Sequence, residues 1–469
     1  MSKPSLPQGT RDFGPEVVRK RQYILATIRS VFELYGFQPL ETPAMENLDT
    51  LMGKYGDEGD KLIFKILNNG LDNPEKEERI RADFEQVLQG RNTKGITERA
   101  LRYDLTIPFA RYVAMNHGQL AFPFKRYQVQ PVWRADRPQR GRYREFYQCD
   151  ADIVGSRALL HEVELVQIYH QAFQKLGIDV EIKINNRKVL SGIAEAIGEP
   201  QRLTDITVAI DKLDKIGIGG VREELERKGF AKEKIDQLNE LILLAQGRAV
   251  DLTDPENPVS ANALQLLKQT GAYGRSADLK QGVEELEYVI DYCTSLGIDN
   301  LQVDFSLARG LNYYTGSIFE VKARNVSMGS IGGGGRYDDL TGLFGVPNIP
   351  GVGISFGVDR IYDVLEELKA FPEAVQQGTR VLFFHLGEAE SRQAYTLLQA
   401  LRAKGVAGEL YHETAKMDKQ FKYAEKKGIP FAAIVGAREL EEKTCRVKDL
   451  RSGEQKDVAF ANINDFLFI

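Results

Sequence analysis

The first stretch of regular hydrophobic spacing lies near the N-terminus. In "PEVVRKRQYILATIRSVFELYGF", residues 15–37, apolar side chains recur at helical intervals, with Pro15 at the start and Gly36 near the end. Proline suits the first turn of a helix and glycine the position just after its end, so the pattern predicts an amphipathic helix. Residues 68–96 then combine dense charge with weak apolar periodicity. They are predicted to form a solvated, partly helical insertion.

Strand-like alternation dominates residues 124–155, "FKRYQVQPVWRADRPQRGRYREFYQCDADIVG". Two alternating arms flank the basic turn "ADRPQRGR", which predicts a long β-hairpin. One face of this hairpin is strongly polar and carries Arg134, Gln148 and Asp152. Pro131 cannot donate a hydrogen bond to a neighbouring strand, so it indicates an edge or a bulge. A half-buried sheet with a polar floor is a common way to build a binding site.

The pattern changes twice more along the chain. Residues 187–297 show helical periodicity and loops, which predicts a helical insertion, and strand-like alternation resumes at "LQVDFSLARG". "GVGISFGVDRIYDVLEELKAF" then predicts a strand followed by a helix with Asp359 and Arg360 in its first turn. From residue 379, strands and helices alternate regularly. This alternation predicts a small, separate α/β domain with a largely parallel sheet.

Composition narrows the class of protein. A chain of 469 residues is too long for one ordinary core. With 42% hydrophobic and 28% charged residues, no long apolar run and no signal-like N-terminus, we expect a globular protein of the cytoplasm with no membrane span. The net charge of −5 argues against indiscriminate coating of nucleic acid. The three cysteines and five histidines are scattered, so we expect no metal site built from cysteine or histidine.

Arginines provide the first candidate chemistry. Seven basic residues and one acidic residue, Asp136, lie between Lys125 and Arg144 among aromatic side chains. Such a ribbon fits a solvated surface as well as a nucleotide contact. Arg309 follows an apolar alternating run, and burying it is costly unless an anion meets it. Arg134, Arg309 and Arg360, on strand ends and a helix start, favour a polyphosphate ligand over three unrelated surface ion pairs.

Two glycine-rich segments need a separate interpretation. "GVGISFG" does not open a βαβ unit, so it is only weak evidence for a dinucleotide site, and a nucleotide-binding oxidoreductase is disfavoured. "GGGGRYD" indicates either a close approach of backbone to a ligand or a sharp turn. "KMDKQ", residues 416–420, lies within the C-terminal α/β pattern and is interpreted as the basic start of a helix.

Together these motifs resemble a known family. "VWRADRPQRGRYREFYQCDADIVG", "GVGISFGVDRIYDVL" and "GFQPLETPAME" are similar to motifs 2, 3 and 1 of class II aminoacyl-tRNA synthetases. "LARGLNYYTG" and "GGGGRYDDL" resemble elements specific to the histidyl-tRNA synthetase family. "GTRDF" and "KQFKYAEKKGIPFAAIVG" are similar to the two ends of that family.

The resemblance implies the fold. It implies an α+β catalytic domain, with the class II antiparallel sheet flanked by helices, a helical insertion, and a C-terminal α/β anticodon-binding domain. The implied boundaries are 1–186 for the first part of the catalytic domain, 187–297 for the insertion, 298–372 for the second part of the catalytic domain and 379–469 for the anticodon-binding domain. The family uses such an insertion to embrace the acceptor arm of the tRNA. A homodimer is also implied.

The resemblance implies an ATP-dependent ligase that joins L-histidine to tRNA(His). Histidine would attack the α-phosphorus of ATP, with Mg²⁺ as the nucleotide's metal, and the adenylate would then acylate the tRNA. No prosthetic group is expected. Arg309 and Arg134 are the implied catalytic residues. The implied histidine-binding residues are Asp104, Leu105, Thr106, Arg134, Gln148, Asp152, Arg309, Tyr313 and Tyr314.

Further implied contacts concern ATP and the tRNA. Those to ATP are Arg134, Asp136, Arg142, Phe146 and Arg360. Arg137 and Gln139 in the motif 2 turn are implied contacts to the acceptor end of the tRNA, although so basic a turn could also contact phosphate generally.

One departure and one rival remain open. Asn312 stands where the family pattern "RGLDYYTG" has aspartate, and its role is unexplained. The rival is the catalytically silent paralogue of the family that regulates ATP phosphoribosyltransferase. It typically lacks the anticodon-binding domain and loses nucleotide-binding arginines, whereas this chain keeps both.

Overall fold

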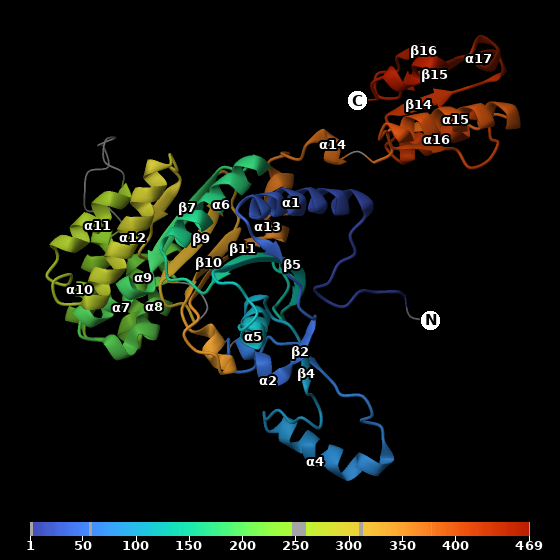
Figure 1. Cartoon of the computed structure of the whole chain (residues 1–469). Coiled ribbons are helices and arrows are strands. Elements are labelled where there is room, and N and C mark those ends of the chain that lie inside the picture. The colour runs from blue at the N-terminus through green and yellow to red at the C-terminus, as the bar shows by residue number, and fades with distance from the viewer. Residues whose placement is uncertain are drawn as a thin grey trace. The chain divides into compact units, whose positions relative to one another are not determined.

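The chain folds into two compact units. The structure is a computed structural model that describes residues 3–55, 59–139, 141–245, 259–308, 313–376 and 378–468. Unit 1 comprises Met1–Asp12 and Arg21–Ala370, and unit 2 comprises Phe13–Lys20 and Phe371–Ile469. Figure 1 labels the helices and strands of both units.

An eight-stranded sheet forms the centre of unit 1. Its order is β1-β5-β6-β11-β10-β9-β7-β8, antiparallel throughout except for the two outer pairs, β1 with β5 and β7 with β8. The expected class II sheet is thereby confirmed. Its strands are β1 (Gln38–Pro39), β5 (Phe124–Trp133), β6 (Glu145–Val154), β7 (Val180–Asn186), β8 (Leu301–Val303), β9 (Ser317–Ala323), β10 (Gly332–Tyr337) and β11 (Gly351–Gly357).

Three helices cover one face of this sheet: α1 (Pro15–Leu34), α6 (Leu160–Leu176) and α13 (Val358–Glu367). Figure 1 shows α1 and α13 beside each other over the strands. Phe32 of α1 and Tyr169 of α6 both pack against Phe356 of β11, with ring centres 5.7 and 4.8 Å apart. The predicted helix α1 is confirmed, with Ile24, Ile28 and the other apolar residues of one stripe buried and Gly36 in the left-handed conformation after its end.

The predicted hairpin is strands β5 and β6, paired in register from Phe124 with Val154 to Trp133 with Glu145. Odd-numbered residues of β6, such as Cys149 and Ile153, are buried beneath the helices. Even-numbered residues therefore point to the other face, as the alternation predicts. Pro131 lies beyond the two residues of β5 that pair with β1, so this part of β5 is an edge, where a missing N–H group is tolerated.

Glycines let β10 and β11 lie closely side by side. A Cβ atom at Gly334 would lie 2.2 Å from the carbonyl oxygen of Gly353, and one at Gly353 would lie 2.0 Å from Oδ1 of Asp152. The "GGGG" segment is a strand, so the expected close backbone approach is observed and the sharp turn is not. Tyr169 supports these strands from below, with its hydroxyl 2.9 Å from the carbonyl oxygens of Gly333 and Ser355.

A small three-stranded sheet, β2-β4-β3, carries the polar insertion. Its strands are β2 (Met45–Asn47), β3 (Lys65–Ile66) and β4 (Arg99–Leu101). The short helix α2 (Leu48–Leu51) follows β2, and the short 3-10 helix η1 (Pro74–Lys76) follows β3. Helix α4 (Glu77–Leu88) lies beyond β4 in Figure 1 and has no buried residue. The insertion is thus solvated and partly helical, as predicted. Helix α5 (Thr106–Asn116) returns the chain to the core.

The described residues of the helical insertion form the predicted helical unit. Its elements are α7 (Arg187–Ala196), η2 (Pro200–Arg202), α8 (Leu203–Ile210), α9 (Leu213–Arg227), α10 (Lys232–Ala245), α11 (Val259–Gln269) and α12 (Ala277–Ser295). Helix α12 packs along α7 and also contacts α6 and β7. Gly192 and Gly282 allow the close approach of α7 and α12, because a Cβ at either would lie 2.4 to 2.8 Å from atoms of the other helix.

The 3-10 helix η3 (Leu340–Phe344) packs on α5.

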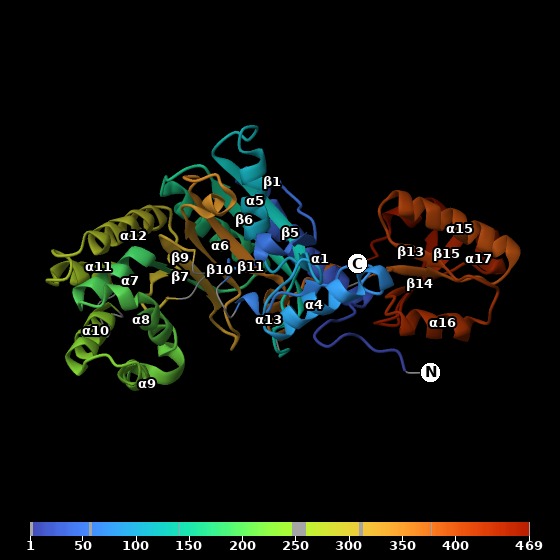
Figure 2. The ribbon, with the colours of Figure 1, turned by 90° about the horizontal axis from the view of Figure 1, so that it is seen from below.

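Unit 2 contains the C-terminal α/β domain. Its sheet has the order β13-β12-β14-β15-β16, and α15 and α16 lie on opposite faces (Figure 2). The predicted strands and helices are present, but the sheet is mixed, because β15 and β16 pair antiparallel. The elements are α14 (Glu373–Gln376), β12 (Val381–Phe383), α15 (Glu388–Ala403), β13 (Gly408–Leu410), α16 (Met417–Lys426), β14 (Phe431–Ile434), α17 (Ala437–Glu442), β15 (Thr444–Asp449), β16 (Gln455–Ala459) and η4 (Phe460–Asp465).

The expectation of a largely parallel sheet was wrong for a simple reason. Residues 444–459 alternate around the turn residues Ser452 and Gly453, and they form an antiparallel hairpin that makes the sheet mixed. The segment "KMDKQ" does begin a helix, since α16 starts at Met417. Among the helices that the structure describes in both units, none combines the length and apolar character needed to cross a membrane.

A buried ion pair joins α6 to β10 and provides a test of the fold. Arg336 donates to both carboxylate oxygens of Glu162, at 2.5 and 2.7 Å, and both side chains are almost fully buried. Glu162→Ala would leave the guanidinium buried without its partner, so we expect a loss of about 3 to 5 kcal/mol in the free energy of unfolding, measured by urea denaturation. The double variant E162M/R336M should recover most of this loss, and a single variant as stable as the wild type would contradict the prediction.

Candidate functional site

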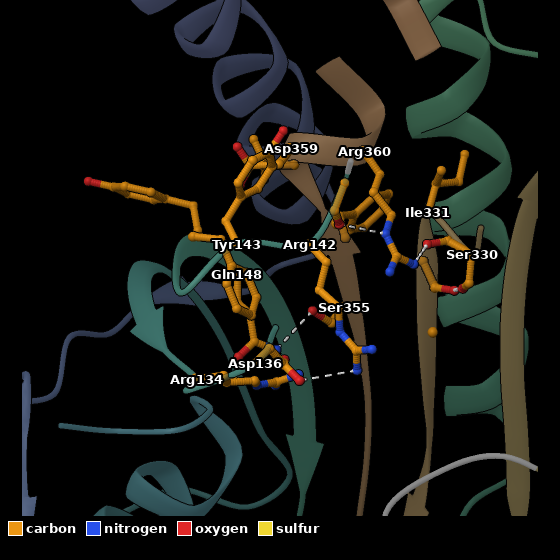
Figure 3. A pocket seen from close by; sticks show the side chains of 18 residues that line it. Arg134, Asp136, Arg142, Tyr143, Gln148, Ser330, Ile331, Ser355, Asp359 and Arg360 are labelled. Carbon is orange, nitrogen blue, oxygen red and sulfur yellow. Dashed lines mark hydrogen bonds and ion pairs between the residues drawn. The ribbon is translucent and has the colours of Figure 1, made fainter. Parts of the chain in front are cut away.

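Two adjoining cavities open on the polar face of the large sheet in unit 1. The larger cavity has a volume of about 310 Å³, within the range typical of small-molecule sites. Figure 3 shows arginines and carboxylates around it from the turn of the β5–β6 hairpin and the start of α13, with Gln148 of β6 and Ser355 of β11 between them. Its lining residues are Arg134, Asp136, Gly141, Arg142, Tyr143, Phe146, Tyr147, Gln148, Ser330, Ile331, Gly332, Gly333, Ser355, Phe356, Gly357, Val358, Asp359 and Arg360.

The smaller cavity, of about 60 Å³, lies over the middle of β6, β10 and β11. Arg134, Gln148, Gly333 and Ser355 line both cavities, so these residues mark the boundary where two bound ligands would meet. The remaining lining residues of the smaller cavity are Asp104, Thr106, Asp150, Asp152, Tyr313, Tyr314, Gly334, Tyr337, Gly353 and Ile354.

A buried cation supports the floor of the smaller cavity. Arg126 of β5, with no exposed surface, lies 2.9 Å from Oδ2 of Asp152 on the paired strand. The hydroxyl of Tyr337 donates to the other oxygen of Asp152 at 2.6 Å. Burial raises the pKa of Asp152, while Arg126 and Tyr337 lower it. These two contacts hold the carboxylate in one position with both oxygens paired.

The other two carboxylates of the smaller cavity are less completely paired. Asp104 accepts hydrogen bonds on Oδ1 from the hydroxyl of Tyr55 at 2.9 Å and from the backbone of Ile107 at 3.1 Å. Its Oδ2 has no hydrogen-bond partner among the described residues. Burial raises the pKa of Asp104, and it raises the pKa of Asp150 to about 7. A cavity lined by three buried carboxylates favours a ligand that brings positive charge.

Backbone carbonyl groups position Arg134 and Arg360 at the larger cavity. Nε of Arg134 donates to the carbonyl oxygen of Tyr103 at 3.0 Å, and the guanidinium lies 4.3 Å from the centre of the Tyr103 ring. Nε and Nη1 of Arg360 donate to the carbonyl oxygens of Gly141 and Ser330, at 3.1 and 2.6 Å (Figure 3). Both side chains line the larger cavity, and guanidinium groups placed in this way suit a polyanionic ligand.

The N-terminal segment fixes the far wall of the larger cavity. Arg11 and Arg21 both donate to Oδ1 of Asp359, the residue before Arg360, at 2.6 and 2.5 Å. The guanidinium of Arg11 also stacks 3.2 Å from the centre of the Tyr143 ring. This network ties the hairpin turn to the start of α13, so the segment resembling the family's N-terminal "GTRDF" has a structural role at the site.

The structure gathers most of the predicted site residues. Asp104, Thr106, Arg134, Gln148, Asp152, Tyr313 and Tyr314 line the smaller cavity, and Arg134, Asp136, Arg142, Phe146 and Arg360 line the larger one. Leu105 lines neither, because its side chain is fully buried and its carbonyl oxygen accepts from Arg126. Arg137 and Gln139 are exposed on the hairpin turn, outside both cavities. Arg309 and Asn312 lie outside the described residues.

Comparison with known proteins decides the family. A family model described as histidyl-tRNA synthetase matches residues 75–361, and one described as an anticodon binding domain matches residues 380–467. Histidine–tRNA ligases of Bacteroides fragilis and Christiangramia forsetii are 52% and 51% identical, over 97% and 99% of both chains. The crystal structure of histidyl-tRNA synthetase from Nostoc sp. PCC 7120 matches with a TM-score of 0.80 at 32% identity, covering 99% of each chain.

The chain belongs to the histidyl-tRNA synthetase family. Its activity is that of the family, ligation of histidine to tRNA with the use of ATP. The predicted synthetase is thus confirmed, as is the class II catalytic fold with a C-terminal anticodon-binding domain. The two rival interpretations, the regulatory paralogue and the oxidoreductase, do not hold.

Several residues at the two cavities were not predicted from the sequence. Arg126 and Asp150 do lie on the predicted polar strand face, so the alternation could have included them. Tyr55 and Tyr337 reach the carboxylates from other elements, and no local pattern marks them. Ser355 lies on the site-facing side of β11, paired in register with Asp150.

The Tyr337–Asp152 contact provides a test of the smaller cavity. A hydrogen bond to a charged group contributes about 1.5 to 3 kcal/mol, so Tyr337→Phe should lower kcat/KM for histidine about tenfold in pyrophosphate exchange, mainly through KM. The KM for ATP should not change.

Tyr127→Phe is the matched control for this variant. It also removes a hydroxyl bonded to a carboxylate, Glu33 at 2.8 Å, but on the helix-covered side of the sheet. We expect it to leave the KM for histidine unchanged. Equal effects of Y337F and Y127F would contradict a role for Tyr337 at the cavity.

Proposed function

We propose that the chain activates histidine as an adenylate in the two adjoining cavities and then transfers the histidyl group to tRNA(His), releasing AMP and pyrophosphate. The observation that supports this most directly is the shared boundary at Arg134, Gln148, Gly333 and Ser355. An acid-lined cavity for an amino acid thus meets a larger, arginine-lined cavity for a nucleotide. The reacting carboxylate and α-phosphate would come together at this boundary.

In this proposal the smaller cavity holds histidine. Asp104, Thr106 and Gln148 bind the α-ammonium group, and Asp152 and Tyr314 bind the two imidazole nitrogens. Tyr313 forms a wall, packed edge-on against Tyr314 with ring centres 5.2 Å apart. Leu105 contributes through its backbone at the start of α5. An amino acid substrate with a side chain other than imidazole would leave a buried carboxylate or hydroxyl of the cavity unpaired, which costs roughly 1 to 3 kcal/mol for each group.

The larger cavity holds ATP in the same proposal. Phe146 stacks on the adenine, and Asp136 and Arg142 make further nucleotide contacts. Arg360 binds the γ-phosphate, supported by its position in the first turn of α13, where the backbone also favours an anion. The bonds from Arg360 to Gly141 and Ser330 hold the two sides of the cavity at a fixed separation.

Catalysis in this proposal is positioning and neutralisation of charge. A carboxylate oxygen of histidine attacks the α-phosphorus, and pyrophosphate leaves. Arg134 binds the histidine carboxylate and the α-phosphate together, supported by its place at the boundary of the cavities. Arg309 approaches the α-phosphate from the other side, a role that rests on the family motif.

We also propose that Mg²⁺ accompanies ATP. Among the described residues there is no group of three histidine, cysteine, aspartate or glutamate side chains that could hold a metal ion. A Mg²⁺ ion at a nucleotide site needs no such group, because phosphates and water supply most of its ligands there. Asp136 and Asp359 are the carboxylates of the larger cavity that could contribute. The ion would neutralise charge on the phosphates.

Contacts with tRNA are proposed for three parts of the chain. The helical insertion, residues 187–297, would embrace the acceptor arm, and the domain formed by residues 379–469 would bind the anticodon, as supported by the family model that it matches. Arg137 and Gln139 would contact the acceptor end, supported by their exposure on the hairpin turn. Residues 1–186 and 298–372 would form the catalytic domain.

Assembly and location complete the proposal. A homodimer is supported by the motif 1 resemblance at β1, whose two residues are exposed at the edge of the sheet. The cytoplasm remains the predicted location.

Pyrophosphate exchange tests the first step. The purified chain should exchange labelled pyrophosphate into ATP with histidine and with no other standard amino acid. Arg309→Ala should reduce this exchange by several orders of magnitude without changing the thermal unfolding of the protein. If wild-type protein with intact active sites showed no exchange, the proposed function would be contradicted. Near-normal exchange by R309A would remove Arg309 from the mechanism.

Truncation tests the division of labour between the parts of the chain. Deletion beyond about residue 376 should leave histidine-dependent exchange within about twofold of the wild type, because both cavities lie within unit 1. Charging of tRNA(His) should fall by orders of magnitude, since the proposed anticodon contacts are lost. An equal loss of both activities would indicate a structural role for residues 379–469.

A further inference from the structure

Asp150 is a third carboxylate of the smaller cavity, and neither the family motifs nor the proposed roles assign it a function. It lies on β6 between Gln148 and Asp152, on the same strand face as both. It is 2% exposed, and it lines the cavity. One residue separates each neighbour along the strand, so the three polar side chains point to the same face and form one continuous floor.

The contacts of Asp150 leave one oxygen available. Ser355, its register partner on β11, lies beside it and lowers its pKa. Oδ1 is buried and has no hydrogen-bond partner among the described residues. A buried carboxylate oxygen without a partner is costly in a folded protein, and such groups occur where a ligand completes the hydrogen bonding.

Charge around Asp150 is also incomplete. Of the residues lining the smaller cavity, Asp104, Asp150 and Asp152 are acids and Arg134 is the cation. Arg126 lies beneath the floor and is paired with Asp152. Burial is the main cause that raises the pKa of Asp150, Arg126 lowers it, and Asp152 and Asp104 raise it.

The remaining titratable neighbours lie around the same group. Tyr169 of α6 and Cys149 of β6 interact electrostatically with Asp150 from the other side of the sheet, and both are fully buried, which raises their pKa values. Both groups therefore stay neutral at physiological pH and add no charge around Asp150.

On β6, Asp150 lies between Gln148 and Asp152, which are proposed to bind the α-ammonium group and the imidazole ring. It lines the smaller cavity together with Tyr314, the other residue proposed to bind the ring. After burial, Asp152 and Asp150 also help to raise the pKa of the Tyr314 hydroxyl. An imidazole ring has a pKa near 6.5, and neighbouring carboxylates favour its protonated form.

We propose that Asp150 is a specificity-determining residue for the amino acid, whose carboxylate selects a basic ring by pairing with the positive charge of the protonated imidazole. This inference rests on the proposed histidine-binding role of the smaller cavity. A ring of the same shape that cannot carry a proton would satisfy the packing but would leave the cavity with unbalanced acids.

The test compares histidine with triazolylalanine, an isostere whose ring is far less basic, in pyrophosphate exchange. The wild type should prefer histidine strongly in kcat/KM. Asp150→Asn keeps the size of the side chain and removes its charge, so we expect the preference to fall at least tenfold, with the KM for ATP unchanged. Asp150→Ser should shift the preference in the same direction, which guards against a local effect of the amide.

Asp205→Asn serves as the matched control. Asp205 is an aspartate of the helical insertion, and its ion-pair partners, Arg202 and Lys228, do not line either cavity. It should leave the preference unchanged. A preference that is the same in folded D150N, D150S and the wild type would overturn the inference while the proposed function stands. Failure of the wild type to activate histidine at all would overturn the proposed function instead.

Discussion

The site depends on one guanidinium that is fully enclosed beneath it. Arg126 touches the carboxylate of Asp152, the carbonyl oxygen of Leu105 and the ring face of Phe109 at once. A buried cation is stable only where its partners are fixed, so this contact couples the register of β5 and β6 to the start of α5. The same coupling brings Asp104, which precedes α5, over the floor that β6 provides. Binding chemistry and fold therefore rely on the same ion pair.

Around this pair, the two cavities are built in opposite ways. The smaller cavity is lined by three acids, whereas Arg134, Arg142 and Arg360 line the larger cavity. Opposite local charge allows an ammonium-bearing ligand and a polyphosphate to occupy adjacent spaces without competing for the same one. Glycines in β10 and β11 keep the floor between them free of bulky side chains.

Local patterns predicted a large part of this arrangement. Alternation along β5 and β6 correctly separated the buried face from the face that carries Gln148 and Asp152, because a strand alternates regardless of what packs on it. Tyr55 and Tyr337 could not be found in this way, since each reaches its carboxylate across a long stretch of sequence. Arg11 likewise meets Asp359 only through the tertiary fold. The roles carried by the family motifs, including that of Arg309, came from resemblance and not from pattern.

The place of β11 in the sheet has a consequence for synthesis of the chain. Strand β6 ends at Val154, but its neighbour β11 begins at Gly351. At a ribosomal rate of about 5 to 20 residues per second, roughly 200 residues take about 10 to 40 s to emerge. For that time one edge of β6, with its buried acids, has no strand beside it. The nascent chain therefore passes through a stage in which the floor of its future cavities is an open sheet edge, the kind of surface that chaperones protect.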